Sequence, residues 1–240
     1  MNVLLDDKHY DWETMSLIDF LNEGNIPSSY QDFFLKHHEE LETISAELSN
    51  STTTIYPPIH QVFRALYLTP LNKIKAVIIG MDPYHNGSAV GLAFSVKAGN
   101  PINPSLRSIY KELKNEKISV VEDGNLSKWA RNGVLLLNTA LTVESNNPDS
   151  HTCLWWNFVK ELILYISTQR NDEIHWMLLG KHAHKLQDVI TTTKTNVHCT
   201  SHPMPLAANR NCGPHPPFFG SNIFRNIPGI DWTISPHGTI

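Results

Sequence analysis

The sequence predicts a single-domain α/β fold: a central, mainly parallel four-stranded sheet flanked by helices on both faces. First, four short apolar runs recur with the length and composition of buried strands, at residues 75–79, 134–137, 174–179 and 197–200. Second, helical patterns separate these runs, and strands that alternate with helices form parallel sheets. Third, a chain of 240 residues, 41% of them hydrophobic, fits one large domain over residues 1–240.

Residues 1–50 precede the first strand and are expected to form a helical region that packs on the core. Apolar and aromatic side chains recur there with the period of about 3.6 residues that marks an amphipathic helix. They are Tyr30, Phe33, Phe34, His37, Leu41 and Ile44. Between the strands, the same period predicts helices at residues 105–117 and 154–168.

Polar residues follow each predicted strand at its carboxyl end. Asp82 follows the first strand, Asn138 the second, Lys181 the third and His202 the fourth. The carboxyl ends of parallel strands share one edge of the sheet, where open α/β folds place their ligand crevice. We therefore expect Asp82, Asn138 and His202 to converge there.

Composition limits the class of protein. No stretch approaches the roughly 20 apolar residues of a membrane span, and the acidic start lacks the basic region of a signal peptide. The formal net charge of −4 argues weakly against a nucleic-acid partner, so any DNA site must be a local patch. The three cysteines, Cys153, Cys199 and Cys212, are odd in number and lack paired spacing, so we expect neither a disulfide framework nor a zinc site.

Several short motifs, in this order, resemble those of the family-1 uracil-DNA glycosylases. They are YPP at residues 56–58, GMDPYH at 80–85, GLAFSV at 91–96, LLLN at 135–138, HPMPL at 202–206 and DW at 231–232. The resemblance implies a monofunctional enzyme of base excision repair. Such an enzyme flips uracil out of single- or double-stranded DNA and hydrolyses its N-glycosidic bond, without lyase activity, metal or other cofactor.

The resemblance assigns the bond cleavage to Asp82 and His202. Cleavage builds positive charge on the deoxyribose and negative charge on the departing uracil, mainly at O2. Asp82 would stabilise the sugar cation and orient water, as a carboxylate does in glycoside hydrolysis. His202, as a neutral imidazole, would donate a hydrogen bond to O2.

The resemblance also implies a uracil pocket formed by Met81, Tyr84, Phe94 and Asn138. The Asn138 amide would pair with N3–H and O4 of uracil, a pattern that cytosine reverses. Tyr84 would exclude the methyl group of thymine, Phe94 would stack on the base, and the backbone N–H of Met81 would contact it. Leu206 would enter the minor groove as an apolar wedge. The further DNA contacts expected are Pro104, Ser105, Lys181, Met204 and Arg210.

The chain departs from the family pattern at several positions. Met81 stands where most members carry Gln, and because the contact there is made by the backbone, we expect activity to survive. Lys181, Met204 and Ala207 replace hydroxyl-bearing residues, and the charge of Lys181 predicts a steeper salt dependence of binding. Residues 211–217 form an insertion, and the segment between residues 85 and 91 is short. Both features resemble herpesviral members and suggest a viral origin.

Two alternatives stay open at this point. One is a catalytically weakened glycosylase fold that serves as a DNA-binding or replication-associated subunit. The other is a metal-dependent hydrolase that uses His182 and His184 with Asp82 and His202, although two histidines only two positions apart would diverge on a helix. The expected partners are uracil-containing DNA and either a proteinaceous glycosylase inhibitor or a replication protein. We expect a monomer in the nucleus, the host nucleus if viral, or in the cytoplasm, and not secreted.

Overall fold

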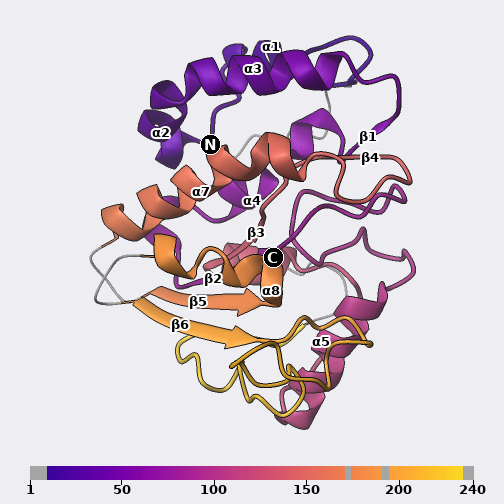
Figure 1. The fold of residues 1–240 in the computed structure, drawn as a ribbon, viewed down its shortest axis with the longest axis vertical. Coiled ribbons are helices and arrows are strands. Elements are labelled where there is room, and N and C mark those ends of the chain that lie inside the picture. The colour runs from indigo at the N-terminus through magenta and orange to yellow at the C-terminus, as the bar shows by residue number, and fades with distance from the viewer. Residues whose placement is uncertain (1–9, 171–173, 191–194, 235–240) are drawn as a thin grey trace.

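A four-stranded, fully parallel sheet forms the centre of the protein, with strand order β3-β2-β5-β6. The structure is a computed structural model that describes residues 10–170, 174–190 and 195–234 (Figure 1). The strands are β2 (Ala76–Gly80), β3 (Val134–Asn138), β5 (Ile174–Leu179) and β6 (Thr195–Thr200). Every residue of β2, β3 and β5 is buried, which is why these strands appear in the sequence as continuous apolar runs. The predicted parallel sheet is confirmed.

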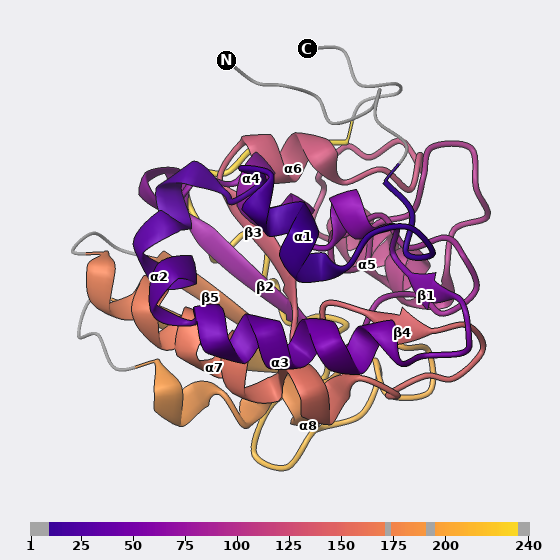
Figure 2. The same ribbon diagram turned by 90° about the horizontal axis from the view of Figure 1, so that it is seen from above.

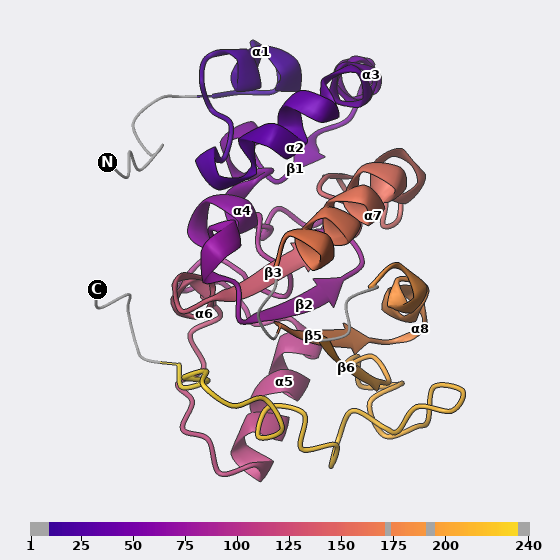
Figure 3. The same cartoon turned by 90° about the vertical axis from the view of Figure 1, so that its left-hand side faces the viewer.

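Helices cover both faces of this sheet. The connecting helices are α5 (Pro104–Asn115), α6 (Ser127–Arg131), α7 (Thr152–Gln169) and α8 (Lys181–His184). The chain passes from β2 to β3 in one direction along the sheet, then crosses back over β2 to β5. Because such crossovers are right-handed, the reversal puts α7 on the opposite face from α5. Figure 3 shows α7 above the sheet and α5 below it.

This topology fixes where a ligand crevice forms. The connection that leaves β2 runs to one face of the sheet, whereas those that leave its neighbours β3 and β5 run to the other. The loops at the carboxyl end of β2 therefore diverge from those of its neighbours, and open α/β folds bind ligands at such a point.

The described part of the N-terminal region, residues 10–50, contains three helices where the sequence indicated one. They are α1 (Leu17–Asn22), α2 (Gln31–Lys36) and α3 (His38–Ser49), with a 3-10 turn η2 (Ser28–Tyr30) before α2. The expectation of a single helix through Tyr30 and Ile44 is wrong, because the chain bends at His37 (φ −105°, ψ 22°). The His37 ring stacks on Phe33 with centroids 4.3 Å apart, and its Nδ1 lies 3.1 Å from a carboxylate oxygen of Glu40. These contacts stabilise the bend.

The N-terminal helices pack on α7, and their side chains join the same buried cluster as the sheet. The ring of Phe33 lies 5.2 Å from that of Phe158 in α7, and Phe34 lies 4.9 Å from Phe63, close to the start of α4 (Arg64–Leu68). Figure 2 shows α3 lying alongside α7. Within the described ranges, no helix is both long and apolar enough to cross a lipid bilayer.

A second, antiparallel sheet was not expected from the sequence. It pairs β1 (Ile55–Tyr56) with β4 (Val143–Glu144), and strands this short show no alternation of polar and apolar residues. The remaining elements are short 3-10 turns, η3 (Ile59–Gln61), η4 (Leu71–Lys73) and η5 (Gln187–Val189).

Candidate active site

Asp82 lies in the loop that leaves the carboxyl end of β2 and is half-buried. The backbone N–H of Asp149 donates a hydrogen bond of 2.8 Å to Asp82 Oδ2. Burial raises the pKa of Asp82 above its ordinary value of 3.8, while the bond from Asp149 opposes that rise by stabilising the carboxylate. The loop thus holds a partly desolvated carboxylate in a fixed position.

The backbone at Met81 is held independently of its side chain. Its carbonyl accepts hydrogen bonds from the Ala140 N–H and from Thr139 Oγ1, both at 2.8 Å. Thr139 Oγ1 also lies 2.7 Å from His182 Nε2, so a chain of polar contacts fixes this loop. The replacement of the family's Gln by Met therefore leaves the anchoring of the loop intact.

Asn138 ends β3 directly beside Gly80, its register partner on β2. The Asn138 side chain is 9% exposed, so its amide faces a largely buried space. A Cβ atom at position 80 would lie 2.2 Å from Asn138 Oδ1, which is closer than any real contact. Glycine at this position is what leaves room for the amide.

A small cavity joins the residues that the sequence assigned to catalysis and to uracil. Asp82, Tyr84, Phe94 and Asn138 line it. The Tyr84 hydroxyl donates to the Phe94 carbonyl at 3.2 Å, and burial raises the pKa of Tyr84, so this hydroxyl is neutral.

His202 follows β6, and its ring lies 5.9 Å from that of Phe94, which lines the cavity. The Met204 backbone N–H donates to His202 Nδ1 at 3.0 Å, so Nδ1 is an acceptor and the ring proton sits on Nε2. Burial lowers the pKa of His202 to about 4. The side chain is therefore a neutral imidazole that offers an Nε2–H donor.

Gly180, between β5 and α8, lets the His202 backbone approach closely. A Cβ atom there would lie 2.8 Å from His202 Cβ, and the backbone adopts φ +94°, a conformation that favours glycine. Lys181 comes next in the chain and is exposed. The fold thus places Lys181 beside the His202 loop.

The turn after His202 presents apolar side chains to solvent. Leu206 is 76% exposed and Met204 45%, and Leu206 is the most exposed large hydrophobic side chain among the residues that the structure describes. The turn is held from within, since Ser201 Oγ donates to the Ala207 carbonyl at 3.0 Å and accepts from the Phe218 N–H at 2.9 Å. A wedge needs this combination of an exposed tip and a fixed base.

The other residues expected to contact DNA lie on the surface. Pro104 and Ser105 begin α5, directly after Asn103, whose Nδ2 donates to Ser88 Oγ at 3.5 Å. Pro104 and Arg210 are exposed and Ser105 is half-buried. Pro104 and Ser105 thus lie at the start of a helix, and Arg210 lies on the turn that carries Leu206.

Asp149 and Ser201 position the active site but were missed from the sequence. Asp149 acts through its backbone N–H, so the identity of its side chain gives no signal. Ser201 directly precedes the HPMPL motif, and that position beside His202 was the available clue.

The metal-hydrolase alternative is contradicted by the directions of its two histidines. His182 Nε2 contacts Thr139 at 2.7 Å, whereas His184 Nε2 lies 2.9 Å from the Thr200 carbonyl. The two rings have separate partners and do not share a metal position with Asp82.

Comparison with known proteins identifies the family. Residues 67–219 match the uracil DNA glycosylase superfamily. The uracil-DNA glycosylase of Azotobacter vinelandii is 40% identical over 208 residues, covering 85% of this chain and 90% of that protein. The enzyme of Geobacillus sp. strain WCH70 is 41% identical over 188 residues, or 76% of this chain and 84% of its own.

Solved structures agree in fold. Mimivirus uracil-DNA glycosylase superposes with a TM-score of 0.79 at 24% identity, covering 97% of both chains. A variant of that protein in complex with UGI gives a TM-score of 0.78 at 26% identity, covering 96% of this chain and 98% of its own. From its sequence matches over most of its length, this chain belongs to the uracil-DNA glycosylase family.

Proposed function

We propose that this protein flips uracil out of DNA and hydrolyses its N-glycosidic bond, leaving an abasic site and free uracil. The observation that carries the proposal is a small cavity lined by the Asp82 carboxylate and Asn138, with the neutral His202 ring packed against Phe94 at its wall. An anion for the sugar and a neutral donor for the base are the two partners that this reaction needs.

Asp82 acts on the deoxyribose. As the bond to uracil lengthens, positive charge develops on the sugar, and a partly buried carboxylate stabilises it more strongly than one in water would. The Asp149 N–H holds Oδ2 and favours the ionised form, which the reaction requires. Asp82 also orients the water that attacks the sugar after the base departs.

His202 acts on the leaving uracil. The Met204 N–H occupies Nδ1, so Nε2–H is the donor available for uracil O2. With its pKa lowered to about 4, the ring has no proton to transfer near neutral pH. It stabilises the negative charge on O2 by a hydrogen bond, and uracil leaves as an anion.

The remaining pocket residues select uracil. The Asn138 amide pairs with N3–H and O4, Tyr84 excludes a methyl group at C5, and Phe94 stacks on the flipped base. The backbone N–H of Met81 completes the contacts. Extrusion of the base from the duplex costs about a few kcal/mol, which the Leu206 wedge offsets by filling the vacated space.

The phosphate contacts would come from Pro104, Ser105, Lys181, Met204 and Arg210, around the cavity mouth and the Leu206 turn. Because a mimivirus relative was solved in complex with UGI, we include a protein inhibitor among the partners. A replication protein as partner, a monomeric state and a nuclear or cytoplasmic location remain predictions.

One assay tests the proposal directly. A labelled oligonucleotide with a single uracil is incubated with the protein, abasic sites are cleaved with alkali, and strand breaks are counted. We expect breaks only at uracil, and a loss of at least about a thousandfold in rate for Asp82→Asn, equivalent to about 4 kcal/mol.

The matched control is Asp149→Asn, because the bond to Asp82 comes from the Asp149 backbone and asparagine tolerates the φ of +69° at that position. This variant should keep its activity. Absence of breaks with the unmodified protein, or equal breaks at thymine, would contradict the proposed function.

A further inference from the structure

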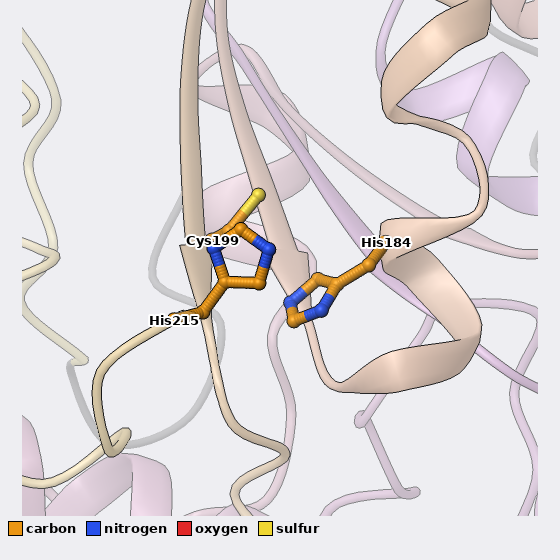
Figure 4. Close-up of side chains that lie close together, drawn as sticks. All are labelled: His184, Cys199 and His215. Carbon is orange, nitrogen blue, oxygen red and sulfur yellow. The ribbon is translucent and has the colours of Figure 1, made fainter. Parts of the chain in front are cut away.

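Three residues with metal-binding side chains lie close together next to β6, an edge strand of the main sheet. They are His184 of α8, Cys199 of β6 and His215 of the loop at residues 211–217, and their ligand atoms all lie within 4.8 Å of one another (Figure 4). A fourth residue, Cys212, places its Sγ 3.8 Å from His184 Nδ1. We propose that His184, Cys199, Cys212 and His215 bind one zinc ion that fastens the 211–217 loop to the sheet.

The donor set is the one that structural zinc sites use. Two thiolates and two imidazoles form a Cys₂His₂ site, in which tetrahedral zinc separates its ligand atoms by about 3.3–3.8 Å. The Cys212–His184 distance of 3.8 Å already falls at the end of that range. The ligand atoms of His184, Cys199 and His215, which lie within 4.8 Å of one another, require closure by about 1 Å through side-chain rotation.

His184 is oriented as a metal ligand. Its Nε2 lies 2.9 Å from the Thr200 carbonyl and 3.1 Å from the Leu178 carbonyl, so this nitrogen carries the ring proton and donates it. The lone pair is then on Nδ1, the atom that faces Cys212. Zinc-bound histidines are held in this way, with the second ring nitrogen bonded to a carbonyl or carboxylate.

The loop presents its two ligands together. The Cys212 N–H donates to the His215 carbonyl at 3.0 Å and the His215 N–H donates to the Cys212 carbonyl at 3.2 Å, closing an antiparallel bridge around Gly213. Residues opposite one another in such a bridge place their side chains on the same side. The His215 ring meets the His184 ring edge-on, with centroids 4.3 Å apart.

A hydrogen bond links the 211–217 loop to the residue that precedes His202. The Pro216 carbonyl accepts from the Ser201 N–H at 2.9 Å, and Ser201 precedes His202 and supports the Leu206 turn. A metal that fixes the 211–217 loop therefore also braces the base of the DNA-binding turn. The zinc has a structural role and takes no part in the reaction.

The first test is metal content. The untagged protein, reduced and loaded with zinc, is freed of excess metal by gel filtration and measured by plasma mass spectrometry. We expect about one zinc per chain, and with cobalt in place of zinc, the charge-transfer absorption of a thiolate-bound tetrahedral ion. Cys212→Ser and His215→Ala should bind less than about a fifth as much zinc under the same conditions.

The control is Cys153→Ser, which removes an exposed cysteine of α7 outside the cluster and should retain the metal. Less than about a tenth of a zinc per chain in the unmodified protein, or full zinc in Cys212→Ser, would overturn the proposal. If Cys199→Ser in β6 fails to fold, the two loop variants still decide the outcome.

The second test is thermal unfolding. Chelation of the loaded protein should lower Tm by about 5 °C or more, whereas Cys212→Ser should show no response to chelator. An equal response in both proteins would contradict the proposed site. Neither test uses glycosylase activity, so their outcome is separate from that of the proposed function.

Discussion

At the residue scale, the environment of His202 sets both its chemistry and a pH dependence of stability. Free histidine has a pKa of 6.5, whereas burial lowers the pKa of His202 to about 4. Between these two values the unfolded chain binds a proton that the folded chain does not. Protonation therefore favours the unfolded state, and the stability associated with His202 rises with pH from about 4 to 6.5 and is fully present above it.

We predict that His202→Gln reduces this pH dependence. The free energy of unfolding of the unmodified protein, from urea titrations at pH 5 and pH 7, should increase more with pH than that of the variant. Other groups with shifted pKa values, Asp82 among them, contribute equally to both proteins and cancel in the difference. Parallel pH profiles would show that the ring is charged in the folded state at pH 5.

The positions of some residues could be predicted from the sequence and those of others could not. Asp82, Asn138 and His202 were predicted because each follows a buried strand and stands in a recognisable motif. The backbone donor of Asp149 leaves no trace in its side chain. The His184–Cys199–Cys212–His215 cluster was missed because a zinc site was expected only where two cysteines stand close together in the sequence. Here separate elements supply the four ligands, and the fold brings them together.

At the element scale, the register between β2 and β3 places Asn138 beside Gly80. Gly80 and Asn138 are the last pair in that register, and both strands are buried along their whole length. A shift or a side chain at this pair would move the Asn138 amide, which we propose selects the base. The absence of a Cβ atom at position 80 is therefore a requirement of packing.

We predict that Gly80→Ala lowers kcat/KM on uracil-containing DNA by about a hundredfold, because the new methyl group displaces the Asn138 amide by about 1 Å or more. The added Cβ would otherwise lie 2.2 Å from Asn138 Oδ1. Steady-state kinetics on a single-stranded substrate measures the effect.

A double-variant cycle supplies the control for this prediction. With Asn138→Ala already present, the oxygen that the methyl group displaces is gone, and Gly80→Ala should add less than about a threefold loss. Additive losses would mean that Gly80→Ala acts through the fold and not through the amide.

The helices and strands could be predicted where their burial produces a regular pattern of apolar residues in the sequence. The strands of the main sheet appear as apolar runs because helices cover both faces, and β5 has the predicted boundaries, residues 174–179. The bend at His37 was not predictable, since the apolar spacing continues across it into α3. The β1–β4 pair is too short to show a period.

At the scale of the whole molecule, the negative net charge of the protein opposes its binding to DNA. The formal charge of −4 repels phosphate at long range, so attraction must come from the local surface at the carboxyl edge of the sheet. Lys181, exposed beside the His202 loop, stands where the family carries a hydroxyl. A charged side chain therefore stands at a position where the family has a neutral one.

We predict that Lys181→Ser makes DNA binding less sensitive to salt. A lysine that contacts one phosphate contributes about 0.9 to the slope of log K against log salt, so the slope should become shallower by about that amount. Fluorescence anisotropy on a uracil-containing duplex between about 50 and 200 mM salt measures it, in the Asp82→Asn background to prevent turnover.

The matched control for Lys181 is Lys36→Ser. Lys36 is exposed on α2, at the end of the molecule where the strands of the main sheet begin and away from the proposed DNA face (Figure 1). Both substitutions change the net charge equally, so a loss of slope caused by overall charge would appear in both variants. We expect it only for Lys181→Ser, because counterion release depends on contact with a phosphate. An unchanged slope in Lys181→Ser would remove Lys181 from the DNA-binding surface.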